Sequence, residues 1–128
     1  MRSRLALASA ALALLLLPSL GLAAEAKERF ISIDGPQGPL KGTMLTPAEP
    51  AEAPVVLILP GSGPTDRDGN NPLGVKASTY RLLAEALAER GIASVRIDKR
   101  GMFASGSAVA DANQVTIADY ASDARGWA

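Results

Sequence analysis

The residues best suited to chemistry stand together at positions 60–63, in the order Pro-Gly-Ser-Gly. They follow residues 55–59, a short apolar run rich in β-branched side chains, which predicts a fully buried strand. Glycines lack a Cβ, so their backbone N–H groups can approach and face a bound atom closely. Because open α/β sheets bind ligands where their parallel strands end, we expect the chemistry of this chain near this loop.

The composition limits the reactions that these residues can support. The 128 residues contain no histidine and no cysteine. A Ser-His-Asp triad cannot be completed within them, and a thiol nucleophile, a disulfide and a metal site built on histidine or thiolate are excluded. The formal net charge is zero and aromatic residues make up only 4%, which argues against a nucleic-acid partner. We expect no cofactor and no metal.

Three phosphate- or metal-binding motifs come close to matching this region, and each fails at a defining position. Asp66 stands where the glycines of 61–63 would need the third glycine of a dinucleotide fingerprint. Val75 stands where a P-loop requires lysine, and Ala77 where a calcium loop requires its bidentate glutamate. We therefore expect the Asp-Arg-Asp run at 66–68 to be a loop held by local side chain–backbone hydrogen bonds, its arginine a candidate partner for a carboxylate.

The G-x-S-x-G nucleophile elbow of serine hydrolases does not occur in the 128 residues. Glycines flank Ser62 directly, whereas the elbow has one residue between the serine and each glycine. Without a base, its hydroxyl would remain unactivated.

Hydrophobic periodicity indicates the elements that must position the loop. Alternation over residues 29–34 and 40–45, around a Gly/Pro-rich turn, predicts a β-hairpin. Apolar residues at helical spacing predict a helix that begins with a cap at Ser78 or Thr79 and ends before Gly91. Its apolar stripe is predicted to contain Leu82, Leu83, Ala86, Leu87 and Arg90.

The chain then returns to the sheet. Residues 92–97 predict a second inner strand, with one face less apolar than that of residues 55–59. Residues 102–113 read as loop, and T-x-x-D at 116–119 is the capping signature of a helix over 116–127. Two such strands separated by a helix predict a parallel pair with a right-handed crossover.

Residues 1–24 read as a Sec-type signal peptide. Arg2 and Arg4 give a positive n-region, residues 5–17 an apolar core, and we expect cleavage after Ala24, with Ala24-Glu25-Ala26 as an alternative site. The apolar run is shorter than the ~20 residues of a membrane span, so an uncleaved anchor is the lesser alternative. The signal peptide predicts a periplasmic or secreted protein with no stable membrane anchor after cleavage.

Three blocks of the sequence together carry a family resemblance. They are LILPGSGPTDRDGN at 57–70, AERGIASVRIDKRG at 88–101 and TIADYASDARGW at 116–127. These blocks resemble the α/β-hydrolase fold, and more narrowly the exported bacterial hydrolases near the dienelactone-hydrolase, acyl-esterase and serine-aminopeptidase-like groups. The resemblance covers about residues 28–128. Many family members begin the first block with His-Gly, where this chain has Pro60.

The resemblance implies that residues 25–128 are the N-terminal portion of an α/β-hydrolase domain. Such a sheet has an antiparallel hairpin, then parallel strands joined by a crossover helix, in the order 1-2-4-3-5. It implies that the backbone N–H of Ser62, with Gly63 as the next candidate, forms half of an oxyanion hole. Residues 98–101 would be a structural corner beside it. The nucleophile elbow would follow the helix at 116–127.

We therefore expect the N-terminal segment of an exported serine hydrolase for ester, thioester or amide bonds, with a small-molecule acyl substrate. The segment is predicted to be inactive alone because the triad is missing. The alternative is a non-catalytic exported module that binds a small anion or partner through Gly61–Gly63. The leading hairpin argues against a third reading, a flavodoxin-like domain. The strand at 55–59 would keep an apolar edge open, so residues 25–128 alone are predicted to be marginally stable or insoluble.

Overall fold

A single mixed sheet forms the centre of the molecule. The computed structural model describes residues 25–128, and the predicted signal peptide lies outside the described residues. The four strands are β1 (Lys27–Ile33), β2 (Leu40–Thr46), β3 (Val55–Ile58) and β4 (Ala93–Ile97). Their order is β1-β2-β4-β3, which agrees with the first four strands of the expected order. In the described part of the chain, no helix is long and apolar enough to cross a membrane.

The sheet combines antiparallel and parallel pairing, as predicted. β1 and β2 form the antiparallel hairpin, in a register that pairs Ile33 with Leu40. β2 continues antiparallel to β4, and β4 pairs in parallel with β3, with Ile58 opposite Arg96. The fold is therefore of the α/β class, with a parallel pair whose two C-terminal ends lie side by side.

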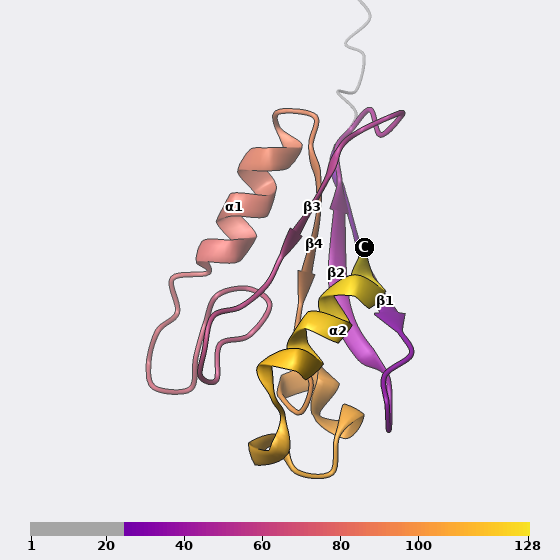
Figure 1. Cartoon of the computed structure of the whole chain (residues 1–128). Coiled ribbons are helices and arrows are strands. Elements are labelled where there is room, and N and C mark those ends of the chain that lie inside the picture. Colours follow the sequence, from indigo (N-terminus) through magenta and orange to yellow (C-terminus); the bar gives the residue numbers. More distant parts are fainter. Residues whose placement is uncertain (1–24) are drawn as a thin grey trace, which may run out of the picture.

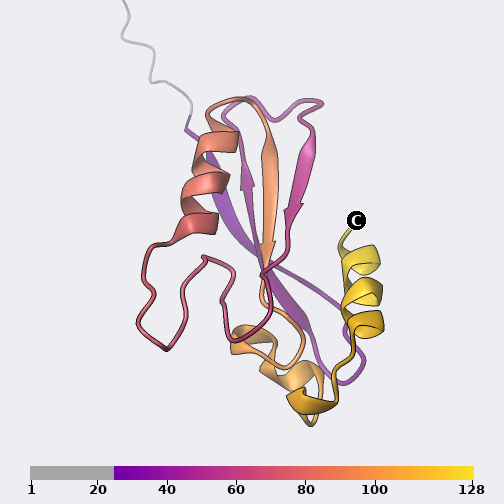
Figure 2. The same ribbon diagram turned by 60° about the vertical axis from the view of Figure 1, so that its left-hand side comes forward.

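Two helices cover opposite faces of this sheet (Figures 1 and 2). α1 (Thr79–Ala88) packs on the face that carries Leu45 and Ile58. α2 (Ile117–Trp127) packs on the other face, where a Cβ on Gly42 would come within 3.0 Å of the Trp127 ring. The T-x-x-D prediction is confirmed, because Thr116 and Asp119 form a reciprocal capping box at the start of α2.

The buried face of α1 differs from the predicted stripe. Leu82 and Leu83 are 57% and 46% exposed. Small side chains pack on the sheet in their place, since alanines four residues apart let a helix backbone approach a sheet closely. The cluster consists of Leu45, Ile58, Ala84 and Ala88, flanked by Tyr80 and Leu87. Among the described residues, no element covers the side of α1 that carries the two leucines.

The start of α1 also departs from the prediction. Ser78 precedes the helix in the left-handed region, with φ 50°, and its side chain caps no helical N–H. The carbonyl of Asp68 accepts hydrogen bonds from the N–H groups of Tyr80 and Arg81 instead. The preceding loop therefore caps the helix with its backbone. The predicted stop is confirmed, because Gly91 has φ 76° and its N–H bonds the carbonyl of Ala88.

β3 is not the fully buried strand that its sequence predicts. Val55 is 58% exposed, Val56 37% and the following Leu59 48%, whereas Ile58 is buried. β3 pairs only with β4, so within the described residues its other edge has no neighbour. All five residues of β4 are buried, including Ser94 and Arg96 on its less apolar face.

The segment after β4 is more ordered than the predicted loop. It forms two short 3₁₀ helices, η1 (Phe103–Ala108) and η2 (Ala112–Gln114). Such short turns have no apolar periodicity that could reveal them in a sequence. Ser105 pins η1 to the sheet, because its buried Oγ donates to the Asp98 carbonyl and accepts from the Lys41 N–H. In Figure 1, η1, η2 and the long loop after β3 gather at the end of the sheet where β3 and β4 finish.

Candidate functional site

The Pro60–Gly63 loop leaves the C-terminal end of β3, as the sequence predicts. Pro60 is buried, and residues 61–64 are exposed. Gly63 has φ 81°, in the left-handed region that favours glycine. This backbone turn is the local reason for a glycine at that position.

The backbone N–H groups of this loop have no hydrogen-bond acceptor among the described residues. Within residues 25–128, the N–H groups of Gly61, Ser62 and Gly63 donate no hydrogen bond. The Ser62 hydroxyl also makes none to any described residue, so neither acid nor base is brought to it. What the loop offers to a ligand is therefore its backbone N–H groups rather than an activated hydroxyl.

Lys99 holds the loop from the adjacent strand end, two residues after β4. Its Nζ donates to the carbonyl oxygens of Gly61 and Gly63, at 2.5 and 2.8 Å. The residue is only 7% exposed, and this burial lowers its pKa below the ordinary lysine value. Nζ also lies 5.7 Å from the ring centre of Tyr120 on α2. One buried cation thus joins the loop, the end of β4 and α2.

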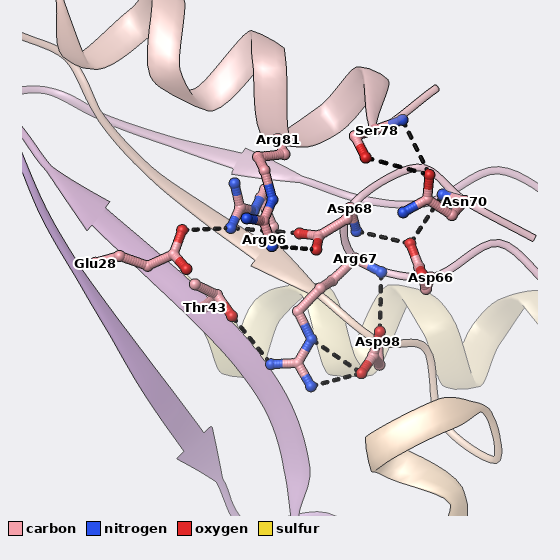
Figure 3. Close-up of polar contacts among 10 residues, drawn as sticks. All are labelled: Glu28, Thr43, Asp66, Arg67, Asp68, Asn70, Ser78, Arg81, Arg96 and Asp98. Atoms are coloured by element: carbon pink, nitrogen blue, oxygen red, sulfur yellow. Dashed lines mark hydrogen bonds and ion pairs between the residues drawn. The ribbon is translucent and has the colours of Figure 1, made fainter. Parts of the chain in front are cut away.

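Asp98, the residue before Lys99, fixes the second half of the loop. Its Oδ2 accepts from Nε and Nη2 of Arg67, at 3.0 and 2.6 Å, and its Oδ1 accepts from the Arg67 backbone N–H at 2.9 Å (Figure 3). The Asp98 side chain is 3% exposed and that of Arg67 15%. The remaining Arg67 nitrogen, Nη1, donates to Thr43 on β2. The expected carboxylate partner of Arg67 is therefore found.

The two acidic residues of the loop itself also bond to protein groups. Asp66 Oδ1 accepts the backbone N–H groups of Asp68 and Asn70, both at 2.9 Å. Asp68 pairs with Arg81 at 2.7 Å and lies 3.4 Å from the buried Arg96 (Figure 3). The described residues contain no group of three or more potential metal-ligating side chains. The local side chain–backbone hydrogen bonds expected in residues 66–68 are found at Asp66, whereas Arg67 and Asp68 also bond to residues of other elements.

Arg100 ties α2 to the same corner. It donates to Asp119 at 3.0 Å and to both oxygens of Asp123, at 2.5 and 3.0 Å. The hydrogen bonds with Asp123, more than those with Asp119, raise the pKa of Arg100. Asp98 and Lys99 therefore hold two parts of the loop after β3, and Arg100 holds α2, at the place where the resemblance implies a structural corner. Gly101 is required here, since with φ 78° a Cβ would meet Val109 and Ala112 at 2.8 Å.

A pocket of about 310 Å³ opens between this loop, the ends of β2 and β4, and α2. Its walls are mainly apolar, and Lys99 and Ser62 contribute polar groups at the edge near the loop. The apolar lining consists of Leu40, Leu59, Pro60, Ile97, Tyr120, Trp127 and the largely exposed Ile117. Its size and lining are those of a small-molecule site.

Sequence reasoning found the loop but missed the residue that holds it. The resemblance implies for Lys99 only a place in the corner at residues 98–101, because the sequence there does not indicate which carbonyl groups a lysine will reach. The charged run directly after an inner strand is nevertheless a signal, because charged side chains buried there must find hydrogen-bond partners. Ser62 and Gly63 lie in the exposed loop after β3, and their role as donors stays a prediction.

No family model matches the chain, and a search of curated proteins also found no match. Among solved structures, the chain is similar to the "PEG-bound complex of a novel cold-adapted esterase from an Arctic intertidal metagenomic library". The identity is 26% and the TM-score 0.46, over 65% of this chain. The match covers 31% of the esterase chain, so the present chain spans about a third of the length of that protein.

Proposed function

We propose that residues 25–128 are the N-terminal part of an exported α/β-fold serine hydrolase that cleaves ester, thioester or amide bonds. One observation carries this proposal. The exposed loop after β3 presents amides that donate to no described residue, while buried Lys99 holds its carbonyls. This is the arrangement that a stabilised oxyanion requires, namely rigid donors that are free in the resting protein.

The proposed role of the loop belongs to the acyl-transfer step. When a serine attacks the substrate carbonyl, negative charge develops on the carbonyl oxygen. The N–H of Ser62, with Gly63 as the next candidate, donates to this oxygen. One such donor typically contributes roughly 10²–10³-fold to kcat. The apolar pocket beside the loop is the proposed place for part of the acyl substrate.

The 128 residues cannot supply the rest of the reaction, because they contain no histidine. We propose that the nucleophile elbow, the acid and the histidine belong to a further segment that pairs with the open edge of β3. That edge carries exposed valines, which is the surface that an additional strand would cover. Residues 1–24 direct the protein to the periplasm or the medium in this proposal.

A second function is a non-catalytic exported module that binds a small anion or a partner through the same amides. The lack of histidine favours it, because such binding needs no base.

The DNA downstream of codon 128 separates the two proposals. A continuation that encodes G-x-S-x-G, followed by an aspartate and a late histidine, supports the hydrolase. A clean stop supports the binding module. At the bench, the 128-residue chain should not turn over a short acyl ester such as p-nitrophenyl acetate. Turnover that a serine-directed inhibitor blocks would contradict the missing triad.

A further inference from the structure

We propose that Lys99 is a positioning residue for the oxyanion hole, and that its ammonium sets the direction of the Ser62 N–H by holding the carbonyl of Gly61. This inference rests on the function proposed for the loop. It assigns to Lys99 a role distinct from charge pairing, since its bonds in the described residues are to carbonyl oxygens.

The geometry of the peptide bond connects Lys99 to the proposed donor. The Gly61 carbonyl and the Ser62 N–H belong to one peptide plane, and the described residues contain no cis peptide bond. In a trans peptide, the C=O and the N–H point in opposite directions. Lys99 holds the C=O at 2.5 Å, so the Ser62 N–H is directed away from the ammonium. To rotate this plane, the protein would have to release a buried charge from its hydrogen bond.

Few other interactions fix this peptide plane. Gly61 and Gly63 restrain the backbone weakly, and a Cβ at either would meet no atom within 4 Å. Lys99 bonds carbonyls on both sides of Ser62, and Gly63 O also accepts the Thr65 N–H at 2.9 Å. The loop is exposed, but the Lys99 side chain that holds it is buried. The backbone N–H groups of the loop are therefore fixed in direction and remain accessible to a ligand.

The charge of Lys99 also has an electronic effect. A cation on the carbonyl oxygen polarises the peptide group, and hydrogen bonds in a chain strengthen one another. The Ser62 N–H therefore becomes a better donor to a developing oxyanion. A neutral apolar side chain of the same length would neither hydrogen-bond the Gly61 carbonyl nor polarise its peptide group.

The same contacts argue against Lys99 as a general base for Ser62. Carbonyl oxygens only accept hydrogen bonds, so both partners of Nζ favour its protonated form. Within the described residues, Nζ makes no hydrogen bond with the Ser62 hydroxyl. Burial lowers the pKa of Lys99, but Nζ bonds to the Gly61 peptide group and not to a hydroxyl that it could deprotonate.

The test is NMR relaxation of the Ser62 amide in the full chain. In the unmodified chain we expect an order parameter near that of rigid backbone, about 0.85, and in Lys99→Met a fall below about 0.6. Lys99→Arg keeps a cation with N–H donors and should restore much of the order. Lys76→Met, at an exposed loop lysine, is the matched control and should change nothing. An unchanged Ser62 amide in Lys99→Met would overturn the proposal.

A pH titration of the unmodified chain keeps the proposal testable if Lys99→Met does not fold. The Ser62 amide should lose order in a step with a midpoint below 10.5, the ordinary lysine value, because Lys99 has a lowered pKa. Of the charged groups around the pocket, Asp98, Arg100 and Asp123 are held in ion pairs. Tyr120→Phe removes the phenolic hydroxyl of the ring whose centre lies 5.7 Å from Nζ, and the step should persist in that variant.

A Ser62 amide that stays ordered through this range would contradict the role of Lys99 and leave the hydrolase proposal intact. A coding region without G-x-S-x-G would contradict the hydrolase and leave the NMR result intact.

Discussion

Asp98 is the carboxylate on which the loop after β3 most depends. It is 2% exposed, and its two oxygens accept from three Arg67 nitrogens and from the Ala104 N–H. A buried carboxylate is tolerated only when its lone pairs are filled in this way. The pair with Arg67 therefore links residues 66–68 to the end of β4, where Lys99 begins its hold on residues 61–63.

Arg67→Met should destabilise the protein strongly, because it leaves the Asp98 charge buried without its main partner. We expect a loss of about 3–5 kcal/mol in the free energy of unfolding, the usual effect of breaking a buried pair from one side. The matched control is Arg81→Met, since the Arg81–Asp68 pair is more exposed and should contribute about 0–1 kcal/mol. Urea unfolding followed by circular dichroism measures both. Equal losses in the two variants would contradict the importance given to Asp98.

At the scale of elements, α2 is stabilised by a capping box at its N-terminus and by hydrogen bonds from Arg100. Thr116 Oγ1 accepts from the Asp119 N–H at 3.2 Å, and Asp119 Oδ2 accepts from the Thr116 N–H at 2.9 Å. These bonds from Thr116, followed by the Arg100 charge, lower the pKa of Asp119. The capping box fixes the start of α2, the helix whose Tyr120 and Trp127 line the pocket.

Thr116→Ala should remove the cap and cost about 1 kcal/mol of stability. Ser122→Ala, at an exposed position of the same helix, is the control and should be neutral or slightly stabilising, because alanine has the higher helix propensity. A folded-state pKa of Asp119 below its ordinary 3.8 means that its contribution is full above that value. The contribution is lost as the pH falls through the lowered pKa.

The difference between the original chain and Thr116→Ala should therefore shrink when urea unfolding is repeated at a pH below the lowered pKa of Asp119. A difference that is the same at acid and neutral pH would show that the Thr116–Asp119 bonds do not carry the effect.

Local signals allowed most of the elements to be predicted. The hairpin, the T-x-x-D cap and the Gly91 stop depend on residues close together in sequence, and all three are confirmed. The buried face of α1 depends on tertiary contacts, so helical periodicity wrongly predicts its exposed leucines in the apolar stripe. The exposure of β3 depends on which strands flank it. The Lys99 contacts depend on side-chain reach across 36 and 38 positions, which no local pattern records.

At the scale of the whole molecule, the sheet has a buried centre, and its edge strand β3 is open among the described residues. β4 is buried along its full length, whereas β3 presents Val55, Val56 and the adjacent Leu59 to solvent. An apolar edge strand is a template for pairing with another chain. We expect residues 25–128 to self-associate through this edge.

Val55→Lys should reduce that self-association, since an edge lysine opposes strand pairing. Leu73→Lys adds the same charge at a loop residue that is 86% exposed and should leave association unchanged. Sedimentation velocity at several concentrations measures the effect. A soluble monomer with a sharp thermal unfolding transition before any substitution would contradict the open-edge interpretation.

The central claim is that Ser62 acts through its backbone N–H and that the nucleophile is a different serine. The most direct test is to treat the product of the whole coding region with a fluorophosphonate and to locate the modified serine by mass spectrometry. We predict a single modified serine, in a G-x-S-x-G sequence encoded after codon 128, and no modification within residues 25–128. Modification of Ser62, or of any other serine in residues 25–128, would contradict the claim.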